Sequence, residues 1–421
     1  MYYSQKTLFK LEKKNIFFYY PSKKVGGAQL LFLRLSLILA RDYGSVFNIF
    51  IIDFPDGFYH QNLKSNSNIK LIDFGREINV SIDILVTPLN FIYKVNDLEG
   101  IRRGTKIFFW DLHPHNLIST SSFYRFIYKN MNSYKSLFSL YGTLEPFRKR
   151  KLKHFMDFAL DHGGVRFMCG FNMWFNTGVL GLERKEEFLP ILLPSNPIVF
   201  NENDKKNSSE LAISWLGRVD EDKYELLERF ICDLSKINRK INLHIIGGGN
   251  RMNYLKSTYG NEFKLITIFY ENTMIGDKLY KFLHDKIHIH FGIGTSVLEG
   301  AMRGIPSILG MSALYKGKKA NYKWLYNSEN KNLAITDESN ELSSHEVLNK
   351  LINEFKLDKN NQIAKNCENY YKITHSEKAI VSNFIGVINN LDFKYDDLLN
   401  IGLFDYSLLE ILIRKIKKTV K

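Results

Sequence analysis

Short apolar runs alternate with amphipathic stretches along the first 200 residues of the chain. The run at 15–20 predicts a buried strand, and after a glycine pair the leucines recur every three or four positions from about 28 to 43, which predicts a helix. Further strands are predicted near 46–54, 69–74, 83–88 and 106–110. Because these runs are apolar throughout, they favour a parallel sheet covered by helices on both faces.

A second strand–helix series begins after a polar stretch. Prolines precede and open the segment "SNPIVFNENDKKNSSE", whose composition predicts a domain linker at 195–210. The strands expected beyond it lie at 211–217, 242–248, 264–269, 286–292 and 305–309. We therefore expect an N-terminal domain at 1–200, a C-terminal domain at 201–385 and a helical segment at 386–421. Two such domains would place a ligand-binding cleft between the carboxyl ends of their sheets.

Composition narrows the class of protein. Of the 421 residues 45% are hydrophobic, which is ample for two cores, and the net charge of +14 indicates a polyanionic or membrane-surface partner. Cys169, Cys232 and Cys367 show no metal or disulfide spacing, which fits a reducing cytosol. The amino terminus lacks the apolar core of a signal peptide, and the longest apolar run is too short to span a bilayer. We expect a cytoplasmic protein.

Two cations follow the first strand of the C-terminal domain. Gly217 ends the strand, Arg218 comes next, and Lys223 lies five residues later near a helix start. The glycine lets the backbone approach a ligand, and the two cations suit a diphosphate, although a solvated loop is the competing interpretation. The acidic residues at 220–222 are a candidate metal pair, but carboxylates before a helix more often cap it, and we expect the cap.

Glycine-rich turns follow two later strands. Gly247 and Gly248 stand in "IIGGG", where they allow close backbone approach to a nucleotide. The G-x-G-x-x-G pattern of dinucleotide sites is absent there, which disfavours a nicotinamide oxidoreductase.

The second turn is the most informative stretch, "HFGIGTSVLEGAMRGIPSIL". Gly292 and Gly294 would bend the chain from strand to helix, leaving free backbone N–H groups to hold an anion. The hydroxyls of Thr295 and Ser296 can cap the helix or bind a phosphate. Glu299 would lie about one turn further on, within reach of a ribose hydroxyl pair, or it is a surface residue that complements the helix dipole.

The N-terminal half has one candidate catalytic cluster. In "FFWDLHPHNL", Asp111, His113 and His115 follow a predicted strand end. Either histidine could bind an acceptor hydroxyl or act as a base. Equally, Pro114 fixes a turn that the histidines cap, and both interpretations stay open.

The ordered set "GGAQ", "GRVDEDK", "IIGGG" and "GIGTSVLEGAMRGIPSIL" resembles the GT-B glycosyltransferases, most closely the family 4-like enzymes of bacterial surface polysaccharide assembly. The resemblance spans nearly the whole chain and is strongest at 213–309. It implies two Rossmann-like, doubly wound parallel-sheet domains that face each other across a cleft. It also implies a nucleotide-diphosphate sugar as co-substrate, a metal-independent reaction and no further cofactor.

Site residues follow from the resemblance at matching positions. It implies that Arg218 and Lys223 bind the donor diphosphate together with the second glycine turn and its helix start. Glu299 matches the family's ribose-binding glutamate, and Gly26 and Gly27 match the glycine loop at the interdomain cleft. Family 4-like enzymes also often carry a histidine after a strand comparable to the one before His113, close to the donor sugar.

One family position departs from the pattern. Eight residues before Glu299, where the family has a glutamate that contacts the donor sugar, this chain has Phe291. A charged hydrogen bond worth about 1.5–3 kcal/mol is therefore missing, so the sugar and the choice between a retaining and an inverting mechanism stay open. His288 and His290 precede it and are expected to pack within the strand, although His290 could instead face the cleft.

Two basic segments bear on partners. "FRKRKLKH" at 147–154 is the densest cationic cluster, and the apolar positions between 408 and 420 fall on one helical arc with cations opposite. The second segment is expected to bind anionic lipid or to dock back on the protein. No base-stacking or groove-reading motif supports a nucleic-acid partner.

We expect a glycosyltransferase that moves a sugar from a nucleotide-diphosphate sugar to a surface polysaccharide or lipid-linked glycan, in the cytoplasm or on the inner face of the cytoplasmic membrane. The alternatives are a nucleotide-sugar epimerase of the same fold and a non-catalytic, sugar-binding assembly protein.

Overall fold

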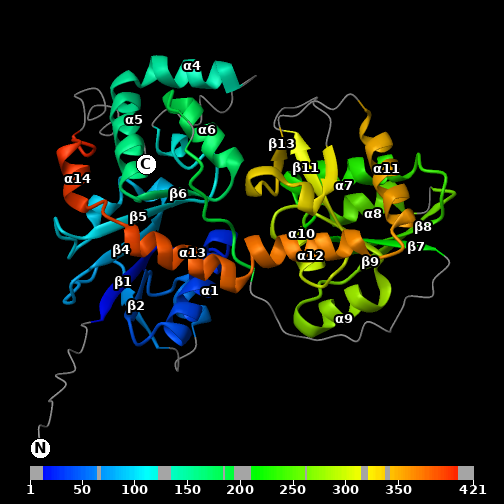
Figure 1. Ribbon diagram of the computed structural model, residues 1–421, viewed down its shortest axis with the longest axis horizontal. Coiled ribbons are helices and arrows are strands. Elements are labelled where there is room, and N and C mark those ends of the chain that lie inside the picture. Colours follow the sequence, from blue (N-terminus) through cyan, green and yellow to red (C-terminus); the bar gives the residue numbers. More distant parts are fainter. Residues whose placement is uncertain are drawn as a thin grey trace, which may run out of the picture. The chain divides into compact units, whose positions relative to one another are not determined.

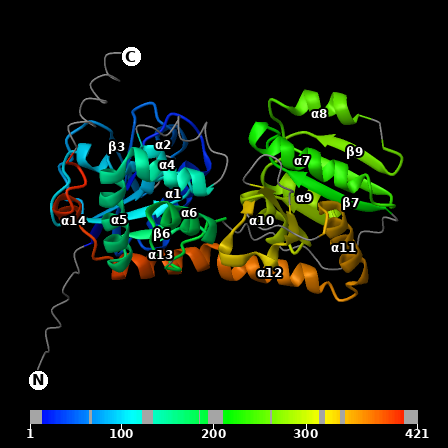
Figure 2. The ribbon, with the colours of Figure 1, turned by 90° about the horizontal axis from the view of Figure 1, so that it is seen from above.

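The structure, a computed structural model, describes residues 13–63, 68–121, 134–183, 185–193, 210–260, 263–313, 321–336 and 342–405. Within them the chain forms two compact units (Figures 1 and 2). Unit 1 draws on Met1–Met168, Asn172–Leu189 and Val381–Lys421, and unit 2 on Cys169–Phe171 and Pro190–Ile380. The C-terminal residues thus return to the first unit, and the described residues 190–193 go with the second.

Unit 1 is built on a parallel sheet with the strand order β3-β2-β1-β4-β5-β6. This 3-2-1-4-5-6 order is that of the doubly wound Rossmann fold, and its switch point lies between β1 and β4. The middle strands are buried on both faces, as their aromatic and branched residues predict. The strands are β1 (Lys14–Tyr19), β2 (Phe47–Asp53), β3 (Ile69–Asp73), β4 (Ile84–Pro88), β5 (Lys106–Asp111) and β6 (Val165–Phe167).

Helices cover both faces of this sheet (Figure 1). Gly26 precedes the first of them, and Pro146 opens α5, where its missing N–H leaves no intrahelical bond unmade. The described helices are α1 (Gly27–Asp42), α2 (Phe58–Asn62), α4 (Tyr134–Leu144), α5 (Pro146–Asp161) and α6 (Gly170–Leu180).

The chain beyond 380 completes unit 1. The second half of α13 (Glu377–Asn390) places Phe384 against Phe18 and Phe108, with ring centroids 6.4 and 6.1 Å apart. The Ile107 N–H donates to the Phe393 carbonyl at 2.9 Å, and α14 (Tyr395–Asn400) follows. The described part of the expected helical segment therefore packs on the first sheet, and the amphipathic stretch from 408 onward lies outside the described residues.

Unit 2 repeats the same strand order. Its path is β12-β11-β10-β7-β8-β9, in which β12 alone is antiparallel to its neighbour and β13 pairs with β11. The switch point lies between β7 and β10, which pair directly although more than 70 residues separate them. The strands are β7 (Leu211–Leu216), β8 (Ile241–Ile246), β9 (Ile266–Glu271), β10 (Ile289–Gly292), β11 (Ser307–Ala313), β12 (Asn321–Trp324) and β13 (Ile335–Thr336).

Helices cover the second sheet as well (Figure 1). The core beneath them is apolar, with Ile213, Leu243 and Ile289 fully buried at its centre. The helices are α7 (Glu221–Leu234), α8 (Met252–Tyr259), α9 (Gly276–Lys286), α10 (Thr295–Ala301), α11 (Ser344–Leu357) and α12 (Gln362–Thr374).

The predicted fold class is confirmed in its two doubly wound sheets. Every strand predicted from an apolar run is present, shifted by no more than a few residues. Three short strands, β6, β12 and β13, gave too few apolar positions to be predicted. The predicted linker lies almost entirely outside the described residues. In the described part of the chain, no helix is both long and apolar enough to cross a membrane.

Candidate functional site

The strand ends at the switch point of unit 2 bring the predicted donor residues together. Strand β7 ends at Leu216 and leads into Gly217 and Arg218, while the adjacent β10 ends at Gly292. Ligands of doubly wound sheets bind outside the carboxyl ends of the strands at such a point. Two stretches that lie 75 positions apart in sequence therefore line one edge of the sheet.

The two cations after β7 differ in how exposed they are to solvent. The Arg218 guanidinium is 72% exposed and pairs with Asp220, Nη1 to Oδ2, at 2.8 Å. Lys223, in the first turn of α7, is half-buried. A Cβ built on Gly217 would lie 3.8 Å from Lys223 Nζ, so the ammonium stands directly beside the glycine.

Asp220 braces this loop. It occupies the N-cap position of α7, as expected, but makes no side-chain cap bond. Instead its Oδ1 accepts from the Asn250 N–H at 3.1 Å while its Oδ2 holds Arg218. The carboxylate thus ties the loop after β7 to the loop after β8.

The glycines after β8 have two different roles. A Cβ on Gly247 would lie 2.2 Å from the Gly217 carbonyl oxygen, and one on Gly249 would lie 2.5 Å from the Val219 oxygen. These two glycines therefore let the neighbouring loops pack backbone on backbone, which the Val219 N–H reinforces by donating to the Gly248 carbonyl at 2.8 Å. Gly248 alone has no atom closer than Thr273 Oγ1 at 3.8 Å, so it is the position where a ligand can approach the backbone.

The turn from β10 to α10 uses most of its polar groups internally. The Ser296 hydroxyl donates to the Ile293 carbonyl at 2.8 Å and accepts from the Ile293 N–H at 3.1 Å. A Cβ on Gly292 would lie 2.8 Å from that hydroxyl, which explains the glycine. Of the two hydroxyls predicted here, Ser296 closes the turn, whereas Thr295 is exposed beside Gly294. Gly294, with φ at +63°, requires a residue without a side chain.

His290 packs inside the strand, as expected. Its Nε2–H donates to the Ser296 carbonyl and its Nδ1 accepts from the Ser214 hydroxyl, each at 2.8 Å. Burial lowers the pKa of His290 to about 4, so the ring stays neutral. The imidazole holds β7, β10 and α10 together and does not reach the strand end.

Phe291, where the chain departs from the family pattern, is a core residue of unit 2. The ring is fully buried and stacks on Phe230, with centroids 3.7 Å apart. Because β10 runs to Gly292 and α10 starts at Thr295, only two residues connect them. The position eight residues before Glu299 therefore lies within β10, and its side chain packs in the core. Glu299 itself is half-buried in the second turn of α10.

In unit 1, Asp111 is a brace. Its carboxylate is fully buried, and the Asn176 amide donates to Oδ2 at 2.6 Å. The Asn172 amide donates to the Asp111 carbonyl oxygen at 2.9 Å, so the residue anchors α6 to the end of β5. Burial raises the pKa of Asp111 well above its usual range. Because no substrate can touch a carboxylate so enclosed, its predicted catalytic role is replaced by one of support.

His113 and His115 form a pair after that strand. The His115 N–H donates to His113 Nδ1 at 3.1 Å, and the ring centroids lie 5.2 Å apart. Desolvation by neighbouring protein atoms lowers the pKa of both rings, and for His115, which also packs against Phe175, to about 4. An Nδ1 that accepts a hydrogen bond fixes the neutral tautomer of His113 with its proton on Nε2. The outer nitrogen of this exposed ring is thus a donor.

The glycine pair of unit 1 opens α1. A Cβ on Gly26 would lie 2.5 Å from Gln29 Oε1, a side-chain atom that could yield. Gly27 has no atom within 4 Å of its Cβ position and faces open space. The buried Gln29 also bonds Tyr20 at the end of β1. The pair therefore lies between the carboxyl end of β1 and the start of α1.

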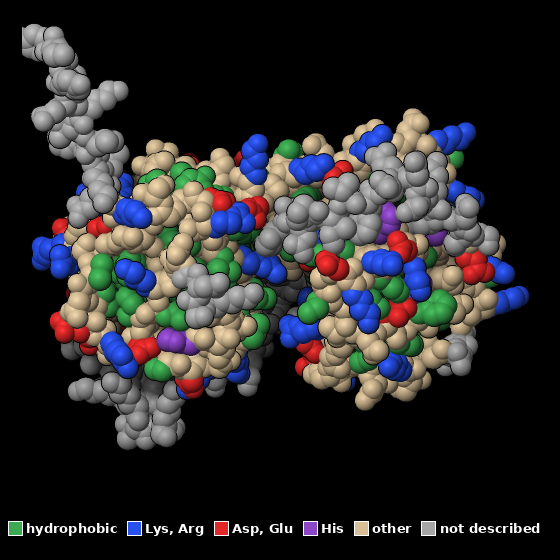
Figure 3. All heavy atoms as spheres, turned by 90° about the horizontal axis from the view of Figure 1, so that it is seen from below, with side chains coloured by type: hydrophobic (Ala, Val, Ile, Leu, Met, Phe, Trp, Pro, Cys, Tyr) green, Lys and Arg blue, Asp and Glu red, His purple; other side chains and the backbone are tan. Residues whose placement is uncertain are grey.

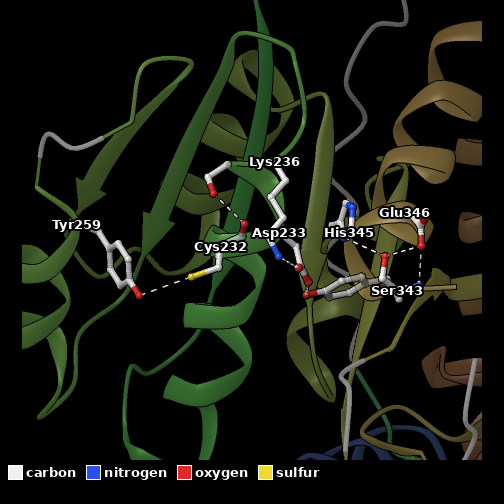
Figure 4. Close-up of polar contacts among 9 residues, drawn as sticks. Cys232, Asp233, Lys236, Tyr259, Ser343, His345 and Glu346 are labelled. Atoms are coloured by element: carbon white, nitrogen blue, oxygen red, sulfur yellow. Dashed lines mark hydrogen bonds and ion pairs between the residues drawn. The ribbon is translucent and has the colours of Figure 1, made fainter.

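A serine, a histidine and a glutamate also meet at the start of α11, where they form a cap. Ser343 Oγ lies 2.9 Å from His345 Nδ1, and the Ser343 N–H donates to Glu346 Oε2 at 2.8 Å (Figure 4). The glutamate accepts from the serine, and no carboxylate among the described residues bonds the imidazole as a catalytic triad requires. This is the capping box of the helix.

Comparison with known proteins identifies the architecture. No sequence family model and no curated protein sequence matches this chain. The lipopolysaccharide outer core galactosyltransferase WaaB, in its apo form, is similar in structure with a TM-score of 0.52 and 10% identity, over 89% of this chain and 99% of that one. Anabaena HepE in complex with UDP and glucose scores 0.45 at 14% identity, over 89% and 99%. A glycosyltransferase from Rickettsia africae also scores 0.45 at 14% identity, over 96% and 99%.

These findings establish the fold. Two doubly wound units with the same strand order, superposable over most of their length on WaaB, are the GT-B architecture. The predicted fold class is therefore confirmed.

Proposed function

We propose that this chain is a metal-independent, family 4-like glycosyltransferase that moves a sugar from a nucleotide-diphosphate sugar to a surface polysaccharide or lipid-linked glycan. The observation that carries the proposal is the placement of Gly217, Arg218, Lys223 and Gly248 at the carboxyl ends of the adjacent strands β7 and β8, beside the switch point of unit 2. The fold-level similarity to a galactosyltransferase supports the same reaction class.

The two cations suit a leaving diphosphate. When the bond from sugar to phosphate breaks, negative charge builds on the β-phosphate. Lys223 beside Gly217 and Arg218 at the loop tip would stabilise that charge from fixed positions. Arg218 already holds a carboxylate, so binding exchanges Asp220 for phosphate oxygens. Two cations can supply the charge that a divalent ion supplies elsewhere, which is why the proposal needs no metal.

The remaining donor contacts follow from position. Glu299, one turn into α10, would bind the ribose hydroxyls, and the Thr295 hydroxyl would contact the diphosphate. Gly248 would let the nucleoside approach the chain after β8.

Unit 1 is proposed to bind the sugar hydroxyls and the acceptor. His113 presents an Nε2–H, so it would donate a hydrogen bond to a hydroxyl. Its Nδ1 accepts the His115 N–H across Pro114, which is the turn-capping interpretation, and we propose that the hydroxyl-binding role of Nε2 accompanies it. Gly27 faces open space and would let a ligand approach the start of α1.

The test is nucleotide binding by calorimetry with UDP, GDP and ADP. Arg218→Ala and Lys223→Ala should each weaken the favoured nucleotide by about tenfold or more. Lys240→Ala is the control, because this lysine of the same unit is 74% exposed and pairs with Glu210 away from the strand ends. Glu299→Ala should weaken the nucleotide but leave inorganic pyrophosphate unaffected. No binding by the wild type, or equal binding by all variants, would sink the proposal.

Product analysis separates the alternative functions. An epimerase would convert the donor sugar in the absence of any acceptor. A non-catalytic binding protein would retain the donor unchanged across a wide acceptor panel, and the missing counterpart of the family's first glutamate keeps that outcome in view. Transfer of radiolabelled sugar to an acceptor supports the proposed reaction.

We also propose that the protein docks on an anionic membrane. On the face shown in Figure 3, basic and acidic side chains are interspersed over both units. Helix α5 differs, because Phe147 is 73% exposed at its start and Arg150 and Lys153 are exposed along it. An aromatic side chain among cations is typical of an interfacial helix. Phe147→Ser should reduce co-sedimentation with phosphatidylglycerol vesicles several-fold, whereas equal binding by this variant would exclude α5.

A further inference from the structure

Trp215 of β7 carries a buried polar group that the fold does not use. Its side chain is fully buried and lies 5.4 Å from Phe291, centroid to centroid. The indole Nε1–H has no hydrogen-bond acceptor among the residues that the structure describes. A buried donor without an acceptor is unfavourable and therefore uncommon in folded proteins. The group requires an explanation.

Two other tryptophans show what the fold normally does with this group. Trp110 Nε1 donates to the Leu189 carbonyl, and Trp324 Nε1 donates to Glu354 Oε2, each at 2.8 Å. Both side chains are as deeply buried as Trp215. The missing acceptor is therefore a property of the Trp215 position and not of tryptophan in this protein.

The indole nitrogen is directed at the strand end. A Cβ built on Gly217 would lie 3.8 Å from Trp215 Nε1 and also 3.8 Å from Lys223 Nζ. These are the nearest atoms outside the immediate chain neighbours of the glycine. The space that a side chain at position 217 would fill is thus bounded by an indole N–H and an ammonium. Both groups donate hydrogen bonds and neither can accept one.

We propose that Trp215 is a binding residue whose indole N–H donates to a diphosphate oxygen laid against Gly217. This inference rests on the proposed function, because it deepens the same donor site. An anionic oxygen in this space meets a cation from α7 and a neutral donor from within the sheet. The neutral donor costs no charge desolvation, yet it favours an oxygen that can accept over any apolar group.

Gly217 is part of the same arrangement. Its φ of +149° is one that side chains rarely adopt, and a methyl group would occupy the space between the two donors. Glycine therefore leaves the space beside the indole nitrogen free of a side chain from position 217. A ring of the same shape without the N–H would fill the core equally, so the N–H itself is needed only if an acceptor binds there.

The experiment replaces Trp215 with 3-benzothienylalanine by amber suppression, which exchanges the N–H for sulfur and keeps the ring shape. Calorimetry with UDP, GDP and ADP should show the favoured nucleotide bound about tenfold to a hundredfold more weakly, with the thermal midpoint of the free protein unchanged. The matched control places the same analogue at Trp324, where the lost bond to Glu354 should lower the midpoint and leave nucleotide affinity intact. Trp215→Phe should bind at least as weakly as the analogue at 215.

The outcomes separate the two proposals. If the wild type binds a nucleotide and the analogue at 215 binds it equally well, the role of Trp215 is overturned and the proposed function stands. A loss of affinity that comes with an equal fall in the thermal midpoint would mark the indole as structural, which also overturns the inference. If the wild type binds none of the nucleotides, both proposals fall.

Discussion

The carboxyl ends of the two sheets carry different kinds of site. In unit 2 the loops after β7 and β8 are shaped by glycines, and the functional groups are backbone and two cations. In unit 1 the loop after β5 is shaped by buried side chains, with Asp111 held by two asparagines of α6 and His113 oriented by a backbone N–H. We therefore propose a backbone site for an anion in unit 2 and a side-chain site for hydroxyls in unit 1.

The two sites should therefore be sensitive to different kinds of substitution. A backbone site depends on the absence of side chains, so an added methyl group should damage it. A side-chain site depends on orientation, so it should tolerate a change that keeps a donor in place. Each substitution below tests one side of this comparison.

Gly247→Ala should have the largest effect. Its Cβ would lie 2.2 Å from the Gly217 carbonyl oxygen, and its φ of +140° is strained for alanine. The free energy of unfolding should therefore fall by about 3 kcal/mol, or the chain should fail to fold. Gly248→Ala is the control, with no atom closer than 3.8 Å, and should lower stability by less than about 1 kcal/mol while it weakens nucleotide binding. Urea unfolding measures both. Equal losses would show that the turn is not packed as described.

Substitutions at His113 should show whether its side chain acts as a hydrogen-bond donor or as a base. His113→Ala should lower kcat for sugar transfer by roughly tenfold to a hundredfold, because the hydroxyl loses its hydrogen bond. His113→Gln keeps an N–H donor and should stay within about tenfold of the wild type. If the imidazole acts as a base, glutamine will be as inactive as alanine. Initial rates at saturating donor decide between the two.

Asp111 should give a pH signature of its burial. Because burial raises its pKa, the folded state holds the proton more tightly than the unfolded state. Its contribution to the free energy of unfolding is complete below the ordinary aspartate pKa near 3.9 and is lost as pH rises through the folded-state pKa, at up to about 1.4 kcal/mol per unit.

Asp111→Asn removes this titration. Between pH 5 and 8 the variant should gain stability relative to the wild type, as followed by urea unfolding, and its transfer activity should change only several-fold because no substrate contacts the carboxylate. Parallel stability curves for the two proteins would mean that Asp111 ionises normally in the folded state.

The comparison also explains what the sequence could predict. Apolar runs and glycine turns are local, so the strands of both sheets and the cluster of Gly217, Arg218 and Lys223 were predictable. The sequence could not predict whether a glycine is needed for packing or for ligand binding. That depends on which backbone atoms lie opposite the glycine, as Gly247 and Gly248 show. The family pattern alone did not show that Phe291 is buried, since an alignment position does not say that a strand continues through it.

Sites formed by side chains are harder to predict from the sequence, for a physical reason. Asn172 and Asn176 contact Asp111 from α6, more than 60 residues away, so no sequence spacing predicts these hydrogen bonds. The unpaired indole of Trp215 is invisible in sequence, because Trp110 and Trp324 look the same there and find acceptors. Contacts made through the tertiary fold decide both roles.

Gly27→Ala should have the smallest effect on stability and be the most specific test of unit 1. Its Cβ position has no atom within 4 Å, and it opens a helix, so alanine should change the free energy of unfolding by no more than about 1 kcal/mol, in the stabilising direction. If a ligand approaches this backbone, the KM for donor or acceptor should rise several-fold although the fold gains stability. Gly386→Ala is a matched control, since its Cβ also meets open space, and should leave KM unchanged. An unaltered KM in Gly27→Ala would mean that no ligand approaches this backbone in unit 1. Ligand binding that depends on glycine would then be a property of unit 2 alone.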